Sequence, residues 1–285
     1  MSRTLGIAAI QMEVHDGNEN MARMRSKIEE TVKYFPWVEL IIFSEKCIFG
    51  RGTAFAQPVP GDATEELCRI AREFGIWLVP GSLNERTYRS IYNTSVVINP
   101  QGKIVTQYRK MYPWRPVEDC KSGKDFCVFD IPGSARLGMT ICYDQWFPEV
   151  IRQLVWMGAE IILNPILTTT MDRNAELIIS QANALFNQVY FVSVNGLCHG
   201  GNGHSIIVDP NGRILQQASE LEQIMPELLD LDLVARVREN GTLGMNQVLK
   251  SFRDEGHTFP VYSGKHHTDG SFAQLRDLEH KYRLL

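Results

Sequence analysis

Three apolar segments of the sequence end on side chains that could react together. LIIFSE ends in Glu45, KIVTQYRK ends in Lys110, and GMTIC ends in Cys142. A thiol can attack a carbonyl carbon, a carboxylate can accept the thiol proton, and an ammonium can stabilise the oxyanion that forms. Each residue alone is more often a surface charge or a packed thiol, but together they favour cysteine-dependent acyl transfer.

The elements that must position these groups alternate between apolar runs and amphipathic segments, which predicts an α/β fold. We expect strands at residues 4–12, 38–45, 76–83, 91–98, 103–108, 135–142, 159–165, 189–195, 205–208 and 213–218. We expect helices at residues 18–35, 61–75, 147–158 and 174–188. Reactive groups of open α/β sheets collect at the carboxyl ends of strands, where the three side chains fall.

Turn and cap residues predict where several elements end. NPQG (99–102) and DPNG (209–212) each combine proline and glycine in the pattern of a tight turn, so each predicts a β-hairpin. Asp62 followed by Glu65 suggests a capping box at the start of the second helix, and Gly75 suggests its C-cap.

The surroundings of Cys142 differ from those of the other cysteines. It lies between a strand and a helix that begins near Pro148, where backbone N–H groups and the helix dipole favour a thiolate. We therefore expect a lowered thiol pKa, and the N–H of Tyr143 as an oxyanion donor. The remaining cysteines form no CxxC pair and are expected to be packing residues: Cys47, Cys68, Cys120, Cys127 and Cys198.

The order of these motifs resembles the carbon–nitrogen hydrolase family, or nitrilase superfamily, from about residue 5 to about residue 245. The matching segments are IAAIQMEVHDGNENMARM, LIIFSE, YRKMYPW, GMTICYDQWFPEVIRQLVWMGAEIILNP, NQVYFVSVN and GNGHSIIVDPNGRIL. The resemblance implies a four-layer α-β-β-α sandwich, a catalytic triad of Glu45, Lys110 and Cys142, and homo-oligomers built from dimers. Residues 246–285 lack the strand–helix rhythm and are expected to form an arm on the body or on a neighbouring subunit.

Two segments resemble different branches of this family. PWRPVE (113–118) is similar to the aliphatic amidase and formamidase branch, which implies that Glu118 lies beside the cysteine and helps to place the substrate. DQWFPE (144–149) is similar to the N-carbamoyl-amine amidase branch. Phe186 stands where many relatives carry a glutamate, and we expect this to affect a structural contact rather than the triad.

The resulting hypothesis is hydrolysis of a small amide to the acid and ammonia through a thioester on Cys142, without a metal or organic cofactor. N-carbamoyl-amine or nitrile hydrolysis on the same triad is an alternative, as is a catalytically silent binding protein. Trp114 and Trp146 are near triad residues in sequence, and could line a pocket for a small acyl group. The histidines fit no metal-binding spacing: His199, His204, His257, His266 and His267.

The composition is that of a mildly acidic globular protein. The 285 residues are 44% hydrophobic and 22% charged, with a net charge of −4, so the charge does not suggest a nucleic-acid partner. No apolar run approaches the length of a membrane helix, and MSRTLGIAAIQMEV lacks the features of a signal peptide. We expect a cytoplasmic enzyme that acts on a small molecule, with no nucleic-acid or membrane partner.

Overall fold

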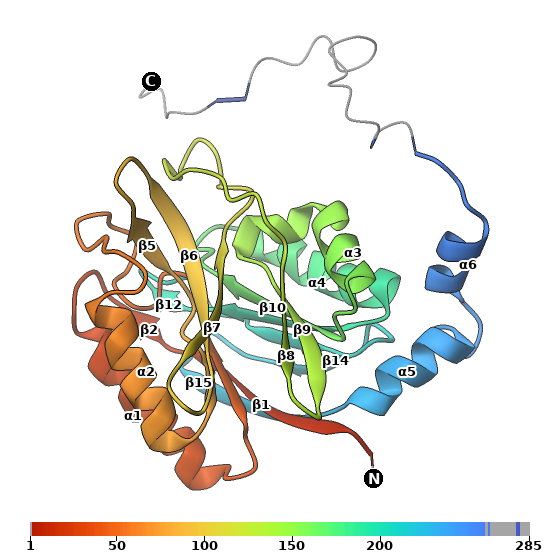
Figure 1. The fold of residues 1–285 in the computed structure, drawn as a ribbon, viewed down its shortest axis with the longest axis horizontal. Helices are drawn as coiled ribbons and strands as arrows, with labels where there is room; N and C mark the ends of the chain where they lie inside the picture. Colours follow the sequence, from red (N-terminus) through yellow and green to blue (C-terminus); the bar gives the residue numbers. More distant parts are fainter. Residues whose placement is uncertain (1, 260–261, 263–277, 280–285) are drawn as a thin grey trace.

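Two β-sheets packed face to face form the centre of the molecule in the computed structural model, which describes residues 2–259, 262 and 278–279 (Figure 1). The first sheet has the order β15–β1–β3–β4–β6–β5, with β7 also paired to β6. Its strands are β1 (Thr4–Gln11), β3 (Leu40–Phe43), β4 (Trp77–Val79), β5 (Leu83–Arg86), β6 (Ile91–Ile98), β7 (Ile104–Arg109) and β15 (Gln223–Asp230).

The second sheet has the order β14–β13–β11–β10–β9–β8. Its strands are β8 (Cys127–Ile131), β9 (Ala135–Met139), β10 (Ile161–Ile166), β11 (Tyr190–Asn195), β13 (Ile206–Val208) and β14 (Ile214–Gln217). The short strands β2 (Glu13–Val14) and β12 (Leu197–Cys198) form a separate parallel pair. The helices are α1 (Asn20–Tyr34), α2 (Asp62–Phe74), α3 (Pro148–Trp156), α4 (Arg173–Asn187), α5 (Leu231–Asn240) and α6 (Val248–Asp254).

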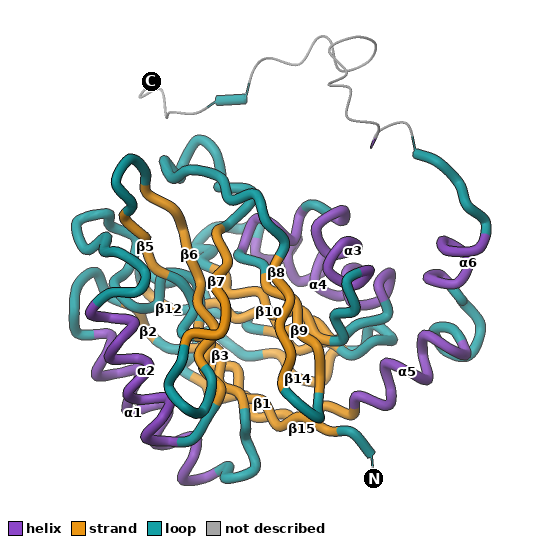
Figure 2. Tube along the Cα trace, viewed as in Figure 1, coloured by secondary structure: helices purple, strands orange, loops and turns teal. Residues whose placement is uncertain are grey.

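Three buried apolar clusters separate four layers. Alternate residues of β1 face opposite sides of its sheet, so Ile7 packs between the two sheets while Ile10 packs toward α1 and α2. Leu163 of β10 likewise faces the other sheet, whereas Ile162 packs toward α3 and α4. Helices therefore cover the outer face of each sheet, as the tube in Figure 2 shows. The predicted α-β-β-α sandwich is confirmed.

The parallel strands bring their carboxyl ends to one region between the sheets. β1, β3 and β4 run parallel in the first sheet, and β9, β10 and β11 run parallel in the second. Just beyond β3, the backbone N–H of Glu45 donates to the carbonyl of Ile166 at the end of β10, at 3.1 Å. This contact joins the two sheets at the place where the predicted reactive residues follow their strands.

Both predicted hairpins form, with β6 paired to β7 and β13 paired to β14. The predicted capping box of α2 is wrong. Gly61 is the N-cap, and its N–H donates to the hydroxyl of Thr64 at 2.8 Å, because the extended backbone at Gly61 brings Thr64 rather than Glu65 within reach. Gly75 closes this helix with a φ of 66°, as predicted.

Two predicted strands end earlier than expected. The segment 76–83 divides into β4 and the start of β5, because Gly81 (φ 78°) turns the chain against the carbonyl of Ser44. The segment 135–142 leaves the sheet after Met139, and Cys142 begins the short 3-10 helix η1 (Cys142–Trp146). The nucleophile candidate therefore lies in a tight turn beyond the strand.

The chain after β14 returns to the first sheet before it leaves the sandwich. β15, which the sequence pattern did not predict, pairs with β1 in antiparallel register from Thr4–Asp230 to Gln11–Gln223. α6 has no buried residue, but the ring of Phe252 meets that of Trp156 edge to face at 5.4 Å. That residues 246–285 form an arm on the body or on a neighbouring subunit remains a prediction. No described helix has both the length and the apolar character that a membrane crossing requires.

Candidate active site

The structure brings Glu45, Lys110, Cys142 and Glu118 to the wall of one cavity of about 450 Å³. Glu45 follows β3, Lys110 follows β7, and Cys142 opens η1 after β9. Glu118 belongs to a loop between β7 and β8. We call this the lysine cavity, and its full lining is Glu45, Lys46, Arg51, Thr53, Asn84, Ile91, Lys110, Trp114, Val117, Glu118, Asp119, Cys120, Cys142, Leu167 and Thr169.

The ammonium of Lys110 is fixed between two carboxylates. Its Nζ lies 2.9 Å from Oε1 of Glu45 and 2.6 Å from Oε2 of Glu118, and its side chain is 1% exposed. Burial alone would lower the pKa of Lys110, but the carboxylates of Glu118 and Glu45 raise it well above its ordinary value. Lys110 is therefore a permanent positive charge on the cavity wall.

Asn93 and Lys46 complete this charge cluster, and the sequence analysis missed both. The side-chain amide of Asn93 donates to Glu45 Oε1 at 2.6 Å and to Glu118 Oε1 at 3.0 Å. Lys46 Nζ lies 3.2 Å from Glu118 Oε1. Asn93 lies in the polar first half of β6 and had no distinct signal in the sequence, whereas Lys46 could have been noticed as the cation that follows Glu45.

Glu118 stays ionised because its surroundings are cationic. Burial raises its pKa, but Lys110 and Lys46 lower it further, to well below the ordinary range. The N–H of Trp114 also donates to Glu118 Oε2 at 2.8 Å. Three hydrogen-bond donors and the ammonium of Lys46 thus hold the carboxylate in one orientation.

Cys142 sits in a strained turn with its thiol largely covered. Its φ is 50°, an unusual value for a residue with a side chain, and it is 7% exposed. As the second residue of η1, Tyr143 has a backbone N–H without an acceptor inside the turn. This geometry resembles a nucleophile elbow, in which the N–H after the nucleophile can face a reacting oxygen.

The predicted lowering of the thiol pKa is wrong. Burial and then the carboxylate of Glu45 raise the pKa of Cys142 well above its ordinary value, while Lys110 and the N–H of Leu167 lower it less. The turn η1 spans five residues, so its dipole is small beside these effects. Cys142 therefore rests as a thiol, and its reaction requires a nearby proton acceptor.

Asp144 anchors the turn that carries Cys142. Its carboxylate accepts the N–H of Ile141 at 2.9 Å, the N–H of Tyr112 at 2.8 Å and the hydroxyl of Tyr108 at 2.7 Å. Burial raises the pKa of Asp144 to about 6, although these hydrogen bonds and Lys110 oppose the rise. The aspartate of DQWFPE thus holds the backbone on both sides of the nucleophile.

A second, smaller cavity of about 250 Å³ is also lined by Cys142. We call it the acidic cavity, and its lining is Trp114, Cys142, Tyr143, Trp146, Leu167, Thr168, Thr170, Asp172 and Glu176. Trp114 and Cys142 line both cavities, and Trp146 lines the acidic one. The structure thus places both predicted pocket tryptophans beside the thiol.

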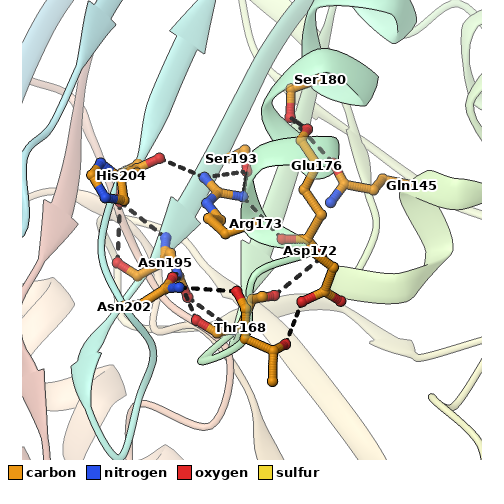
Figure 3. A network of polar contacts seen from close by, with 12 residues as sticks. Gln145, Thr168, Asp172, Arg173, Glu176, Ser180, Ser193, Asn195, Asn202 and His204 are labelled. Atoms are coloured by element: carbon orange, nitrogen blue, oxygen red, sulfur yellow. Dashed lines mark hydrogen bonds and ion pairs between the residues drawn. The ribbon is translucent and has the colours of Figure 1, made fainter.

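A buried ion pair stands at the wall of the acidic cavity, and no sequence motif indicated it (Figure 3). Arg173 Nη1 lies 3.2 Å from Glu176 Oε2, and both side chains are at most 3% exposed. The hydroxyl of Thr168 donates to Glu176 Oε1 at 3.0 Å. The guanidinium of Arg173 also donates to the carbonyl of His204 at 2.6 Å and contacts the hydroxyl of Ser193 at 3.4 Å.

The remaining sequence candidates lie away from this region. Phe186 is 56% exposed on α4 and lines neither cavity, and the structural contact expected at this position stays a prediction. Among the described residues, no three His, Cys, Asp or Glu side chains gather as a metal site. His266 and His267 lie outside the described residues.

Comparisons with known proteins identify the family of the chain. The model of the family Carbon-nitrogen hydrolase matches residues 6–239. A formamidase of Helicobacter acinonychis (strain Sheeba) is 32% identical over 205 residues, which cover 66% of this chain and 61% of the formamidase. The omega-amidase NIT2 of Mus musculus is 28% identical over 258 residues, which cover 83% of this chain and 92% of that protein.

Solved structures show the same architecture. Saccharomyces cerevisiae Nit3, a member of branch 10 of the nitrilase superfamily, matches with a TM-score of 0.77 and 26% identity over 84% of this chain and 94% of that chain. An amidase from Nesterenkonia sp. AN1, solved in complex with butyramide, matches in fold with a TM-score of 0.74 and 22% identity, over 84% of this chain and 95% of that chain. Since the family match spans most of the sequence and the fold agrees with it, the chain belongs to the carbon–nitrogen hydrolase family, within the nitrilase superfamily.

Proposed function

We propose that the protein hydrolyses the C–N bond of a small amide, giving the acid and ammonia through a thioester on Cys142. The observation that carries this proposal is the ammonium of Lys110, held by Glu45 and Glu118 on the cavity that Cys142 also lines. A buried cation, a carboxylate and a thiol on one wall supply the oxyanion donor, the base and the nucleophile of acyl transfer.

The first half of the reaction acylates the enzyme. Glu45 accepts the proton of Cys142 while the sulfur attacks the amide carbon, because a thiol with a raised pKa does not ionise beforehand. The oxyanion accepts hydrogen bonds from Lys110 and from the N–H of Tyr143. Glu45 then gives its proton to the amide nitrogen, and the C–N bond breaks. Ammonia departs, and the acyl group remains on Cys142 as a thioester.

The second half releases the acid. Glu45 accepts a proton from water as the water oxygen attacks the thioester carbon, and the same donors stabilise the second oxyanion. When the C–S bond breaks, Glu45 returns the proton to the sulfur of Cys142. The acid leaves, and the thiol and the carboxylate regain their starting states.

In this proposal Glu118 is a positioning residue. Its two oxygens already accept from Lys110, Lys46, Asn93 and the N–H of Trp114, and its pKa is depressed, so it is poorly suited to carry a proton. It fixes Lys110 where the oxyanion forms. The relatives named formamidase and omega-amidase support an amide substrate over a nitrile or an N-carbamoyl amine.

We also propose that the protein is a cytoplasmic enzyme and that it forms homo-oligomers. Ile178 is 68% exposed and Phe186 is 56% exposed on α4, which supports an apolar contact between subunits. Sedimentation velocity of the purified protein tests this expectation, and a species with the mass of one chain would contradict it.

The test of the reaction is rapid-quench mass spectrometry of the intact protein mixed with short amides, carbamoyl amines and nitriles. We expect an acyl adduct on Cys142 with the amides, and the loss of adduct and of ammonia release in Cys142→Ala. Cys120→Ala is the matched control, because Cys120 is the other thiol on the lysine cavity and its pKa is raised to about 11. Full hydrolysis by Cys142→Ala would overturn the proposal.

A further inference from the structure

The two cavities that meet at Cys142 differ in the charges on their walls. The lysine cavity mixes Lys46, Arg51 and Lys110 with acidic residues. The acidic cavity has Asp172 and Glu176 in its lining, and no Lys, Arg or His among the described residues that form it. A substrate bound at Cys142 with its far end in the acidic cavity therefore meets the carboxylate of Asp172 and that of Glu176, which is paired with Arg173.

Aromatic side chains also line the acidic cavity. Trp114, Tyr143 and Trp146 all line it, and the rings of Tyr143 and Trp146 lie 6.2 Å apart. Indole and phenol faces attract cations, most strongly where water is excluded. Carboxylates and aromatic faces around one small space are the combination that binds an ammonium group.

The buried ion pair keeps Glu176 at the cavity wall. Its Oε2 is held by Arg173 and its Oε1 by the hydroxyl of Thr168. Figure 3 shows Arg173 directed toward Ser193 and His204. Arg173 pairs with Glu176 rather than with Asp172, whose carboxylate accepts the hydroxyl of Thr170. The charge of Asp172 therefore stays available to a ligand.

We propose that the acidic cavity binds a cationic group at the end of the substrate remote from the scissile bond, and that Asp172, Glu176 and Trp146 determine this specificity. The inference rests on the amide hydrolysis proposed above and names its substrate class, a short amide with a terminal ammonium. The volume of about 250 Å³ is below that of drug-sized ligand pockets, which favours a linker of a few carbons.

The experiment compares three amides of nearly equal length that differ in the charge of the far end: 4-aminobutanamide, pentanamide and succinamate. Hydrolysis is measured with the wild-type protein, and binding is measured by calorimetry with Cys142→Ala. We expect 4-aminobutanamide to exceed pentanamide by about tenfold in both kcat/KM and affinity, and succinamate to be the poorest of the three. High salt should reduce the preference.

Three variants locate the effect. Asp172→Asn and Glu176→Gln should each bring the ratio of cationic to neutral amide toward one, mainly by slowing the cationic substrate. Asp119→Asn, which removes the same charge from the lysine cavity, should leave that ratio near its wild-type value. Retention of the full ratio in both acidic-cavity variants would overturn the assignment.

Failure of the inference is distinguishable from failure of the proposed reaction. Equal binding of the three amides, or a preference for succinamate, would overturn the inference whether or not hydrolysis occurs. Preferential binding of 4-aminobutanamide to Cys142→Ala without hydrolysis by the wild-type protein would support the cation site and overturn the amidase proposal.

Discussion

Two buried ion clusters flank Cys142, and they differ in which of their charged groups reach the space beside it. In the lysine cavity Lys110 and both of its carboxylate partners, Glu45 and Glu118, line the wall. In the acidic cavity the carboxylate of Glu176 reaches the wall, and Arg173 is absent from the described lining. Buried ion pairing therefore gives a wall of mixed charge in the lysine cavity and a wall without a cation among the described lining residues of the acidic cavity.

The largest loss of activity should come from removing Lys110, the cation held by Glu45 and Glu118. Lys110→Met should reduce kcat/KM by about 10³-fold or more, because the oxyanion loses its charged donor and Glu45 and Glu118 then repel each other. Steady-state ammonia release measures the loss. Lys46→Met is the matched control and should cost less, since Lys46 contacts Glu118 alone. Equal losses in the two variants would contradict the role given to Lys110.

Removing Arg173, the cation paired with Glu176 at the acidic cavity, should act mainly on the stability of the protein. Arg173→Met leaves Glu176 buried without its cation, and should lower the free energy of unfolding by about 3 kcal/mol. Denaturant titration measures this change. Adding Glu176→Gln should restore part of the loss, because the uncompensated charge disappears. An Arg173→Met protein as stable as the wild type would show that the ion pair is dispensable.

The uncharged partners of the two clusters should also differ, with the larger loss of stability at the partner of Glu45 and Glu118. Asn93→Ala removes donors to both Glu45 and Glu118, and should cost about 2 kcal/mol of stability together with part of the activity. Ser193→Ala removes a hydroxyl 3.4 Å from Arg173, and should cost less than about 1 kcal/mol. Thermal unfolding of the two variants side by side is the measurement. A larger loss of stability in Ser193→Ala than in Asn93→Ala would contradict this prediction.

The last prediction concerns the reactivity of the thiol itself. Because Glu45 raises the pKa of Cys142, Glu45→Gln should lower that pKa and speed alkylation by iodoacetamide at neutral pH, by about tenfold per pKa unit, while hydrolysis falls. Glu176 also raises this pKa, but less than Glu45, so Glu176→Gln should give a smaller increase. In the wild-type protein, alkylation should still be rising above pH 9. Slower alkylation of Glu45→Gln would contradict the prediction.

The residues that follow strands could be predicted from the sequence, and those that depend on contacts between the sheets could not. Glu45, Lys110 and Cys142 each follow an apolar run, and the topology brings such strand ends together. Arg173 and Glu176 lie one helical turn apart at the start of a helix, which is also the pattern of an exposed ion pair. Their burial depends on β11 and on the chain near His204, which the local pattern does not reveal.

The direction of the pKa shift of Cys142 likewise could not be predicted from the local sequence. A cysteine before a helix start predicts a stabilised thiolate when the dipole dominates. Here the turn is short, and burial near Glu45 outweighs it, so the sign of the shift depends on a residue from the other sheet. The α/β class, by contrast, follows from apolar patterns within single segments, although these patterns did not predict β8 or β15, and the four-layer sandwich was expected from the family resemblance.

The pairing of β1 with β15 determines when, during synthesis, this site can be completed. Thr4 pairs with Asp230, so β1 leaves the ribosome long before β15, and its sheet gains that edge only after β15 has emerged. Glu45 and Lys110 emerge before Cys142, and the apolar layer between the sheets includes Met225 and Leu229 of β15 as well as Cys142. The chain therefore assembles its reactive thiol late, when nearly the whole enclosure around it has been made.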